Sequence, residues 1–306
     1  MKTRNCKVLV VGAGPGGYVA AIRAGQLGMD TVIVEGQRAG GTCLIRGCIP
    51  SKALIHAAHT FHKLANHAKK GGHMGIRIPG PAELKMKDTV AWKDAIVDRL
   101  NKGVEALLKN AGVEFINGWA QFQDAKTVKI GKGKDALLIQ AENVILANGS
   151  IPVELPFMKF GDHVISSKEA LSLEELPKRI AVVGGGYIGL ELGITFRMLG
   201  SDVTIIEAMD SVLPIFDKEL RRPLEIAIKK QKIAVHTKVF AKGVEPQDDG
   251  SVDLLYSPKD ATEGSEPERL NVDKVLVTVG RRPTSAALAP TGVALDERGF
   301  VKVNNK

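Results

Sequence analysis

Cys43 and Cys48 are the two residues of this chain whose type and spacing most clearly suggest chemistry. The chain has only three cysteines in 306 residues, and these two are separated by just four positions. A thiol pair that follows a dinucleotide-binding unit is typical of a disulfide that opens and closes by exchanging electrons with a bound cofactor. The alternative is two unconnected, buried thiols. A redox enzyme is therefore the leading hypothesis.

A repeated unit surrounds the cysteines and must position them. An apolar run followed by a glycine-rich turn occurs at residues 8–17 and again at residues 180–189. Each copy continues through a helical segment and a second apolar run to an acid, Glu35 or Glu207, which lies 23 residues after the first glycine of the turn. One glycine motif is weak evidence, but two copies with matching strands and acids predict two dinucleotide-binding units.

Each part of the repeated unit has a physical task. The first glycine makes a tight turn, the second lets the backbone approach a pyrophosphate, and the third lets the helix pack on the strand. These glycines are Gly12, Gly14 and Gly17 in the first copy and Gly184, Gly186 and Gly189 in the second. The helix N-terminus offers free N–H groups to the phosphates, and the acid accepts hydrogen bonds from the ribose hydroxyls.

The acids and the cysteines together predict the cofactors. Glu207 would repel a 2′-phosphate, and no arginine occurs at residues 208–211, so the second unit should prefer NAD over NADP. Electrons leave a dithiol in pairs, whereas nicotinamide accepts a hydride, so a mediator that handles both is needed. FAD held by Glu35 in the first unit meets that need. The predicted fold class is α/β, with two Rossmann-like dinucleotide-binding domains, the second inserted in the first.

The rest of the chain is divided by its apolar spacing. The pattern predicts helices over residues 51–70, 89–111 and 218–230. Short strands are expected at residues 113–116, 127–130, 137–139, 144–147, 252–256 and 274–279, and loops at residues 71–87 and 257–269. Residues 1–149 are predicted to form an FAD-binding domain with the redox disulfide, residues 150–280 an NAD-binding domain, and residues 281–306 the start of a return to the first domain.

Composition argues against two other classes of protein. The formal net charge is +8, but the basic residues are dispersed, so a nucleic-acid partner is not expected. No apolar run reaches the length of about 18 residues that a membrane span needs. The N-terminal apolar run leads directly into the first glycine turn and resembles a strand more than a signal peptide, which indicates a cytoplasmic protein.

Four histidines and one further cysteine are given no catalytic role. His56, His59, His62 and His67 lie on one predicted helix, but no accompanying cysteine or acid pattern marks a metal site, so no metal is expected. Cys6 opens a strand and is expected to be a small buried hydrophobic residue.

Three motifs resemble the flavoprotein disulfide reductases, and within them most closely the dihydrolipoamide dehydrogenases. They are the segments at residues 41–52, 184–191 and 279–283, which read GTCLIRGCIPSK, GGGYIGLE and VGRRP. The resemblance covers nearly the whole chain. Residues 52–56 and 90–93 are similar to the form that serves branched-chain 2-oxo acids.

The resemblance implies a role for individual residues. Cys48 would face the flavin and Cys43 would exchange disulfides with dihydrolipoamide, while Lys52 would sit by the reactive flavin nitrogen with Glu191 as its ion-pair partner. The implied FAD-site residues are Gly12, Gly14, Gly17, Glu35, Thr42, Lys52, Ala120 and Gly149. The implied NAD-site residues are Gly184, Gly186, Gly189, Glu207, Val239 and Gly280. The implied partners are a homodimer mate and the lipoyl domain of a 2-oxo acid dehydrogenase complex.

The chain also departs from the family pattern. Ile45 stands where the family usually has asparagine, and Asn148 where it usually has threonine. Family members continue beyond the equivalent of Lys306 into an interface domain that supplies a His-Glu dyad, and no histidine follows His236 here. The resemblance therefore implies a C-terminally truncated enzyme of low activity, since loss of acid–base help costs about 10²–10⁴ in rate.

Two alternatives to that enzyme stay open. The chain could be a non-catalytic module that binds FAD or NAD, without physiological turnover. It could also be a reductase of another disulfide substrate or of mercuric ion. Glu207 argues against the NADPH-linked reductases, and the thiol pair near the C-terminus that marks a mercuric enzyme is absent from this sequence.

Overall fold

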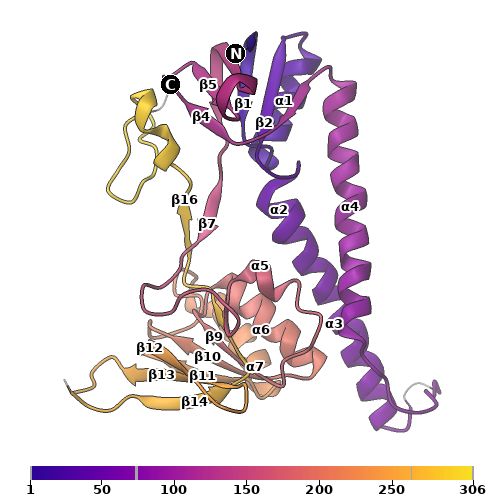
Figure 1. Ribbon diagram of the computed structural model, residues 1–306. Coiled ribbons are helices and arrows are strands. Elements are labelled where there is room, and N and C mark those ends of the chain that lie inside the picture. The colour runs from indigo at the N-terminus through magenta and orange to yellow at the C-terminus, as the bar shows by residue number, and fades with distance from the viewer. Residues whose placement is uncertain (1, 73–74, 263, 305–306) are drawn as a thin grey trace. The chain divides into compact units, whose positions relative to one another are not determined.

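The computed structural model describes residues 2–72, 75–262 and 264–304 (Figure 1). The chain divides into two compact units. The first unit contains Met1–Pro50, Ala95–Ile151 and Arg281–Lys306, and the second contains Ser51–Asp94 and Pro152–Gly280. The second unit therefore includes residues 51–94, which the sequence analysis assigned to the first domain.

The first unit is built on a six-stranded sheet of order β3-β2-β1-β6-β5-β4. Strand β1 (Lys2–Val11) lies in the middle of the sheet. It pairs in parallel with β2 (Thr31–Glu35) on one side and with β6 (Leu137–Leu146) on the other. The outer strands are β3 (Glu114–Asn117), parallel to β2, and β5 (Thr127–Ile130) and β4 (Ala120–Phe122), which run antiparallel. Because β1 and β2 are parallel, the turn after Val11 and the acid Glu35 meet at one edge of the sheet.

Helices cover one face of this sheet. They are α1 (Pro15–Gln26), α2 (Gly41–Arg46) and the C-terminal part of α4 (Met86–Asn110), and their apolar side chains pack on Val8, Val10 and Ile33. The opposite face buries Leu9 and Val11 against side chains of β4, β5 and β6. Two 3₁₀ turns, Gly133–Asp135 and Ala286–Thr291, complete the unit, and Leu288 of the second turn joins that opposite core.

The second unit repeats the parallel arrangement. Its five-stranded sheet has the order β11-β10-β9-β15-β8, with all pairings parallel. These strands are β8 (Val164–Ile165), β9 (Arg179–Val183), β10 (Asp202–Glu207), β11 (Ala234–Thr237) and β15 (Lys274–Val277). The helices are α5 (Ser167–Ala170), α6 (Tyr187–Leu199), α7 (Lys218–Lys230) and most of α3 (Cys48–Lys69).

Two cores hold the second unit together. On one face, Ile180, Val182 and Ile205 pack against α6, and Leu54 of α3 belongs to the same cluster. On the other face, Ala181 and Val183 contact an antiparallel sheet of order β12-β13-β14. Its strands are β12 (Val239–Pro246), β13 (Val252–Pro258) and β14 (Glu268–Val272). The remaining strands, β7 (Ser150–Pro152) and β16 (Arg281–Pro283), lie mainly in the first unit and pair with each other.

Several sequence-based expectations are confirmed and others are wrong. The helix expected at residues 218–230 and the strand expected at residues 127–130 have the predicted limits, and the helices predicted at 51–70 and 89–111 begin three residues earlier. The two strands expected at residues 137–139 and 144–147 are one strand, β6, because the polar residues between them also pair with β1. The loop expected at residues 257–269 contains the end of β13 and the start of β14. None of the described helices combines the length and the apolar character that a membrane crossing requires.

Candidate functional site

The first glycine turn leaves no room for side chains. Gly12 has φ +100°, and a Cβ there would lie 2.2 Å from the carbonyl oxygen of Ala147. A Cβ on Gly17 would lie 1.8 Å from the carbonyl oxygen of Gly12. Gly14 is the N-cap of α1, and no side chain caps that helix end. The N–H groups at the start of α1 are therefore available to an anionic ligand.

Glu35 closes this turn from the end of β2. One carboxylate oxygen accepts a hydrogen bond from the N–H of Ala13 at 2.9 Å, and the other accepts one from the N–H of Gln37 at 2.9 Å. Each oxygen of an ionised carboxylate has capacity for a further hydrogen bond. The acid can therefore hold the turn and bind a ribose hydroxyl at the same time.

The second copy reproduces the first in its main-chain contacts. A Cβ on Gly184 would lie 2.8 Å from the carbonyl oxygen of Thr278, and one on Gly189 would lie 2.1 Å from that of Gly184. Gly186 is the N-cap of α6, again without a side-chain cap. Glu207 accepts hydrogen bonds from the N–H groups of Gly185 at 2.6 Å and Met209 at 2.7 Å, and it is 7% exposed.

The segment that carries the cysteines is packed onto the first glycine turn. The N–H of Gly40 donates to the carbonyl oxygen of Ala13 at 2.7 Å. Gly41 has φ +57°, and a Cβ there would lie 2.5 Å from the Cα of Gly14. Because only glycine fits at this approach, α2 begins directly against the turn that is expected to hold a pyrophosphate.

The two cysteines lie on either side of a break between helices. Cys43 is half-buried in α2, and Cys48 is the exposed first residue of α3. Gly47 separates the helices, and a Cβ on it would lie 2.8 Å from the carbonyl oxygen of Thr42. Both cysteine residues have interaction partners in the structure. Cys6, in contrast, is buried in β1, and this burial raises the pKa of its thiol to about 11.

Lys52 and Glu191 meet within the second unit. The ammonium of Lys52, on α3, donates to both carboxylate oxygens of Glu191, on α6, at 2.8 and 2.9 Å. The two side chains are 58% and 37% exposed, so the pair is open to solvent. The structure thus brings together two residues that lie 139 positions apart in the chain and that the sequence analysis paired.

Arg281 contacts the neighbour of Cys43, and sequence reasoning missed this contact. Its guanidinium donates to the carbonyl oxygen of Ser150 at 2.5 Å and to the hydroxyl of Ser150 at 2.9 Å, and it lies 3.5 Å from the hydroxyl of Thr42. Thr42 is the neighbour of Cys43, so Arg281 links α2 to β7. The sequence motif at residues 279–283 drew attention to this arginine, but its partners are too distant along the chain to be read from the pattern.

The remaining predicted FAD-site residues lie at strand ends and turns of the first unit. Ala120 opens β4 and pairs with Ile130. Gly149 has φ +71°, and its carbonyl oxygen accepts a hydrogen bond from the N–H of Thr284 at 3.0 Å. Asn148, which departs from the family pattern, donates its side-chain amide to the carbonyl oxygen of Thr284.

The remaining predicted NAD-site residues lie in the second unit. Val239 is buried at the start of β12. Gly280 has φ +126°, and its carbonyl oxygen accepts from the N–H of Val153 at 3.0 Å.

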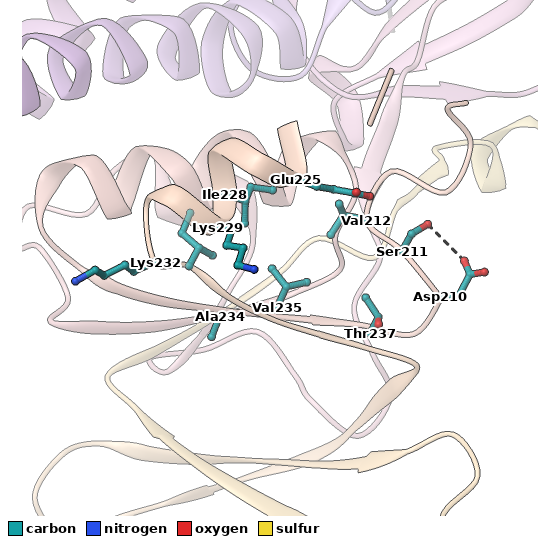
Figure 2. Close-up of a pocket in the computed structure, with 11 residues that line it drawn as sticks. Asp210, Ser211, Val212, Glu225, Ile228, Lys229, Lys232, Ala234, Val235 and Thr237 are labelled. Atoms are coloured by element: carbon teal, nitrogen blue, oxygen red, sulfur yellow. Dashed lines mark hydrogen bonds between the residues drawn. The ribbon is translucent and has the colours of Figure 1, made fainter. Parts of the chain in front are cut away.

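Two cavities lie apart from these residues. One, of about 530 Å³, is lined by α7, β11 and the loop after β10, with Val212, Ile228 and Val235 as apolar walls (Figure 2). None of the predicted NAD-site residues lines it. The other, of about 600 Å³, is open and lined by the four histidines of α3 together with Lys63 and Lys70. Within the described ranges, no group of three or more histidine, cysteine, aspartate or glutamate residues could hold a metal ion.

Comparisons with known proteins agree with this arrangement. Residues 6–306 match the family described as pyridine nucleotide-disulphide oxidoreductase. The chain is 46% identical over 301 residues to a dihydrolipoyl dehydrogenase of Pseudomonas aeruginosa, and 42% identical over 302 residues to one of Geobacillus stearothermophilus. Each alignment covers 98% of this chain but only 62% of the relative, so the chain spans less than two thirds of their length.

The fold is also that of a solved flavoprotein. The structure of HOCl-induced flavoprotein disulfide reductase RclA from Escherichia coli matches with a TM-score of 0.80 and 25% sequence identity, over 97% of this chain and 62% of that chain. Its Cu(II) complex matches with a TM-score of 0.81 and 24% identity, over 98% and 62% of the two chains. The sequence match over residues 6–306 and the two glycine turns lead to one conclusion: the chain belongs to the pyridine nucleotide-disulphide oxidoreductase family.

Proposed function

We propose that this chain carries the cofactor-binding and redox-disulfide part of a dihydrolipoyl dehydrogenase. FAD binds in the first unit, NAD binds in the second, and Cys43 and Cys48 form the disulfide that accepts electrons from protein-bound dihydrolipoamide. The observation that carries the proposal is the packing of Gly41 on Gly14, which starts the redox helix at a phosphate-binding turn. The 40–46% identity to dihydrolipoyl dehydrogenases supports the choice of substrate.

The residues of the first unit fit FAD. Gly12 and Gly17 have no side chains, and no side chain would fit at either position. A pyrophosphate can therefore approach the start of α1 closely. Glu35 keeps acceptor capacity for the ribose, and Gly14, Thr42, Ala120 and Gly149 are proposed to line the same site. FAD, when bound, accepts an electron pair from a dithiol and passes it to nicotinamide as a hydride.

The residues of the second unit fit NAD. Glu207 is the buried acid at the end of β10, and Gly184, Gly186, Gly189, Val239 and Gly280 are proposed to surround the dinucleotide. Arg221, a basic residue of α7, donates to Ser211 and to the carbonyl oxygen of Val212 in the loop that follows Glu207. Because Arg221 is bonded to the loop, it is not assigned to a 2′-phosphate. The preference for an unphosphorylated ribose is therefore assigned to the carboxylate of Glu207.

The chemistry assigned to the cysteines is thiol–disulfide exchange. One thiolate of dihydrolipoamide attacks the Cys43 sulfur, forming a mixed disulfide and releasing Cys48 as the thiolate. The second substrate thiol then attacks the mixed disulfide, which closes the lipoamide ring and leaves Cys43 reduced. The enzyme has gained two electrons and the substrate has lost two. Cys48 is the first residue of the 22-residue helix α3.

Two single substitutions test these roles. In the reduced, FAD-loaded chain, Cys48→Ser should abolish the long-wavelength thiolate–flavin absorption, because the thiolate assigned to the flavin is gone. Cys43→Ser should strengthen that absorption, because Cys48 can no longer be drawn into a disulfide. Absorption spectra recorded during titration with dithionite provide the measurement, and Cys6→Ser is the matched control. Identical spectra for the Cys43 and Cys48 variants would refute the assignment.

A further inference from the structure

Residues 36–40, here called the connecting segment, join the ribose acid Glu35 to the redox helix α2. Fixed contacts hold it along its length. Gly36 lies under the indole of Trp119, where a Cβ would come within 2.5 Å of the ring. The carbonyl oxygen of Gln37 accepts a hydrogen bond from the amide of Asn117 at 2.6 Å. These contacts fix the end of the segment nearer to Glu35.

Asn101, on α4, fixes the other end. Its side-chain amide donates to the carbonyl oxygen of Ala39 at 2.7 Å, and its side-chain oxygen accepts from the guanidinium of Arg38 at 2.9 Å. Asn101 is 4% exposed and Ala39 is fully buried. Arg38 is in turn paired with Asp98, one helical turn before Asn101, at 2.7 Å. The NH₂ group and the oxygen of the Asn101 amide thus bond to two consecutive residues of the connecting segment, Ala39 and Arg38.

The bond between Asn101 and Ala39 matters because Ala39 lies just before α2. Ala39 lies two residues before the start of α2 and four before Cys43. A buried carbonyl group that loses its donor must move toward another partner, because an unsatisfied polar group in the interior is costly. Any such movement is transmitted to α2, since Gly40 and Gly41 are packed on the first glycine turn with no free space.

We infer that Asn101 is a positioning residue for the redox cysteines. Its bond to the Ala39 carbonyl fixes where α2 begins, and thereby fixes the separation and reactivity of Cys43 and Cys48. The hydrogen bonds of the Asn101 side chain go to Arg38 and Ala39, so it acts through the connecting segment. The inference rests on the proposed function, because it takes these two cysteines to be the working pair.

The test uses the full chain and a substitution that separates the two halves of the amide. Asn101→Asp keeps an oxygen for Arg38 but removes the donor to Ala39. Asn143→Asp is the matched control, since Asn143 of β6 also donates to a backbone carbonyl of the first unit, that of Lys7, at 3.3 Å, but is exposed. Asp98→Asn removes the charge that pairs with Arg38 and leaves the Ala39 bond in place.

Two thiol measurements that need no cofactor are decisive. The first is the ratio of the alkylation rates of Cys43 and Cys48 by iodoacetamide in the reduced chain, with buried Cys6 as an internal unreactive thiol. The second is the equilibrium constant of the Cys43–Cys48 disulfide against dithiothreitol. Asn101→Asp should change both by roughly tenfold, which corresponds to about 30 mV in reduction potential. Asn143→Asp and Asp98→Asn should stay within about twofold of the unmodified chain.

Clear outcomes separate the inference from the proposed function. A folded Asn101→Asp chain with an unchanged alkylation ratio overturns the inference. If that variant fails to fold, Asn101→Thr, which is shorter and cannot reach Ala39, replaces it under the same criteria. Failure of the unmodified chain to bind FAD or to form the disulfide counts against the proposed function, and the alkylation ratio in the reduced chain still decides the role of Asn101.

Discussion

Lys52 and Glu191, to which the family resemblance assigns a chemical role, form an ion pair that should contribute little to stability. Their charges meet at 2.8 Å, but both side chains are more than one third exposed. Solvent screens such pairs, and they contribute about 0–1 kcal/mol. The pair therefore has to be tested by a functional measurement and not by unfolding alone.

Lys52→Met should leave the free energy of unfolding within about 1 kcal/mol of the unmodified chain. In the FAD-loaded chain, the rate of flavin reduction by NADH should fall about 10²-fold if Lys52 supplies the positive charge that the family resemblance assigns to the flavin. Stopped-flow absorbance at the flavin band measures the rate. Lys159→Met is the matched control, since Lys159 pairs with Glu154 at 3.1 Å with similar exposure. Equal rates for both variants would contradict the catalytic role predicted for Lys52.

Helix α2 depends on a glycine for its position. Gly41 has both a positive φ and a neighbouring backbone atom in the place of a Cβ, whereas Gly28 has φ +72° and open space around it. The two glycines therefore separate the cost of the backbone conformation from the cost of the clash.

Gly28→Ala should destabilise the chain by about 1–2 kcal/mol, the cost of a left-handed conformation for alanine. Gly41→Ala should cost more and should also weaken FAD binding, because α2 must move away from the first glycine turn. Urea unfolding and FAD titration by fluorescence quenching provide the two measurements. Equal stability and equal FAD affinity in the two variants would show that the contact between Gly41 and Gly14 does not position α2.

The elements that the sequence predicted well are those with a strong local pattern. The two glycine turns and the helix Lys218–Lys230 belong to this group, since glycine spacing and apolar periodicity are local properties. Strand β11 was missed because it is an edge strand with mostly exposed residues, and β14 because its only fully buried side chain is Val272. Neither strand has the alternation of buried and exposed residues that predicts a strand from sequence. Each forms because it pairs with a neighbouring strand.

The candidate site shows the same limit. The Lys52–Glu191 contact was predicted from a family resemblance, while the contacts of Arg281 and Asn101 were not predicted at all. Arg281 reaches a residue 239 positions away, and the Asn101 amide meets Ala39 across 62 positions. Nothing in residue type or spacing marks such partners. Side chains that position a site through the backbone become visible only in three dimensions.

On the scale of the whole molecule, one leucine of each long helix is buried in a different core. Leu54 of α3 is buried in the core of the second unit, together with β9 and α6. Leu108 of α4 is buried in the core of the first unit, with Val10 and Ile33. A chain with two cores of this kind can lose stability in one unit before the other.

Leu54→Ala and Leu108→Ala should each cost about 2–5 kcal/mol, because both side chains are at most 2% exposed. The losses should appear in different places. Leu54→Ala should speed amide hydrogen exchange in β9 and β10 more than in β1, and Leu108→Ala should do the reverse. Hydrogen exchange followed by mass spectrometry of peptides measures both. The same exchange pattern in the two variants would mean that the units unfold as one.

The fastening of the connecting segment has a consequence for the lengths this chain can tolerate. Most surface loops accept an inserted residue, because the extra length can bulge into solvent. Residues 36–40 have little such slack, since Trp119, Asn117, Asn101 and Ala13 hold Gly36, Gln37, Ala39 and Gly40 in turn. An added or deleted residue would break several of these contacts at once and slide α2 along the glycine turn. The spacing of eight residues from Glu35 to Cys43 is therefore fixed. Substitutions within this interval should be tolerated far more readily than insertions or deletions.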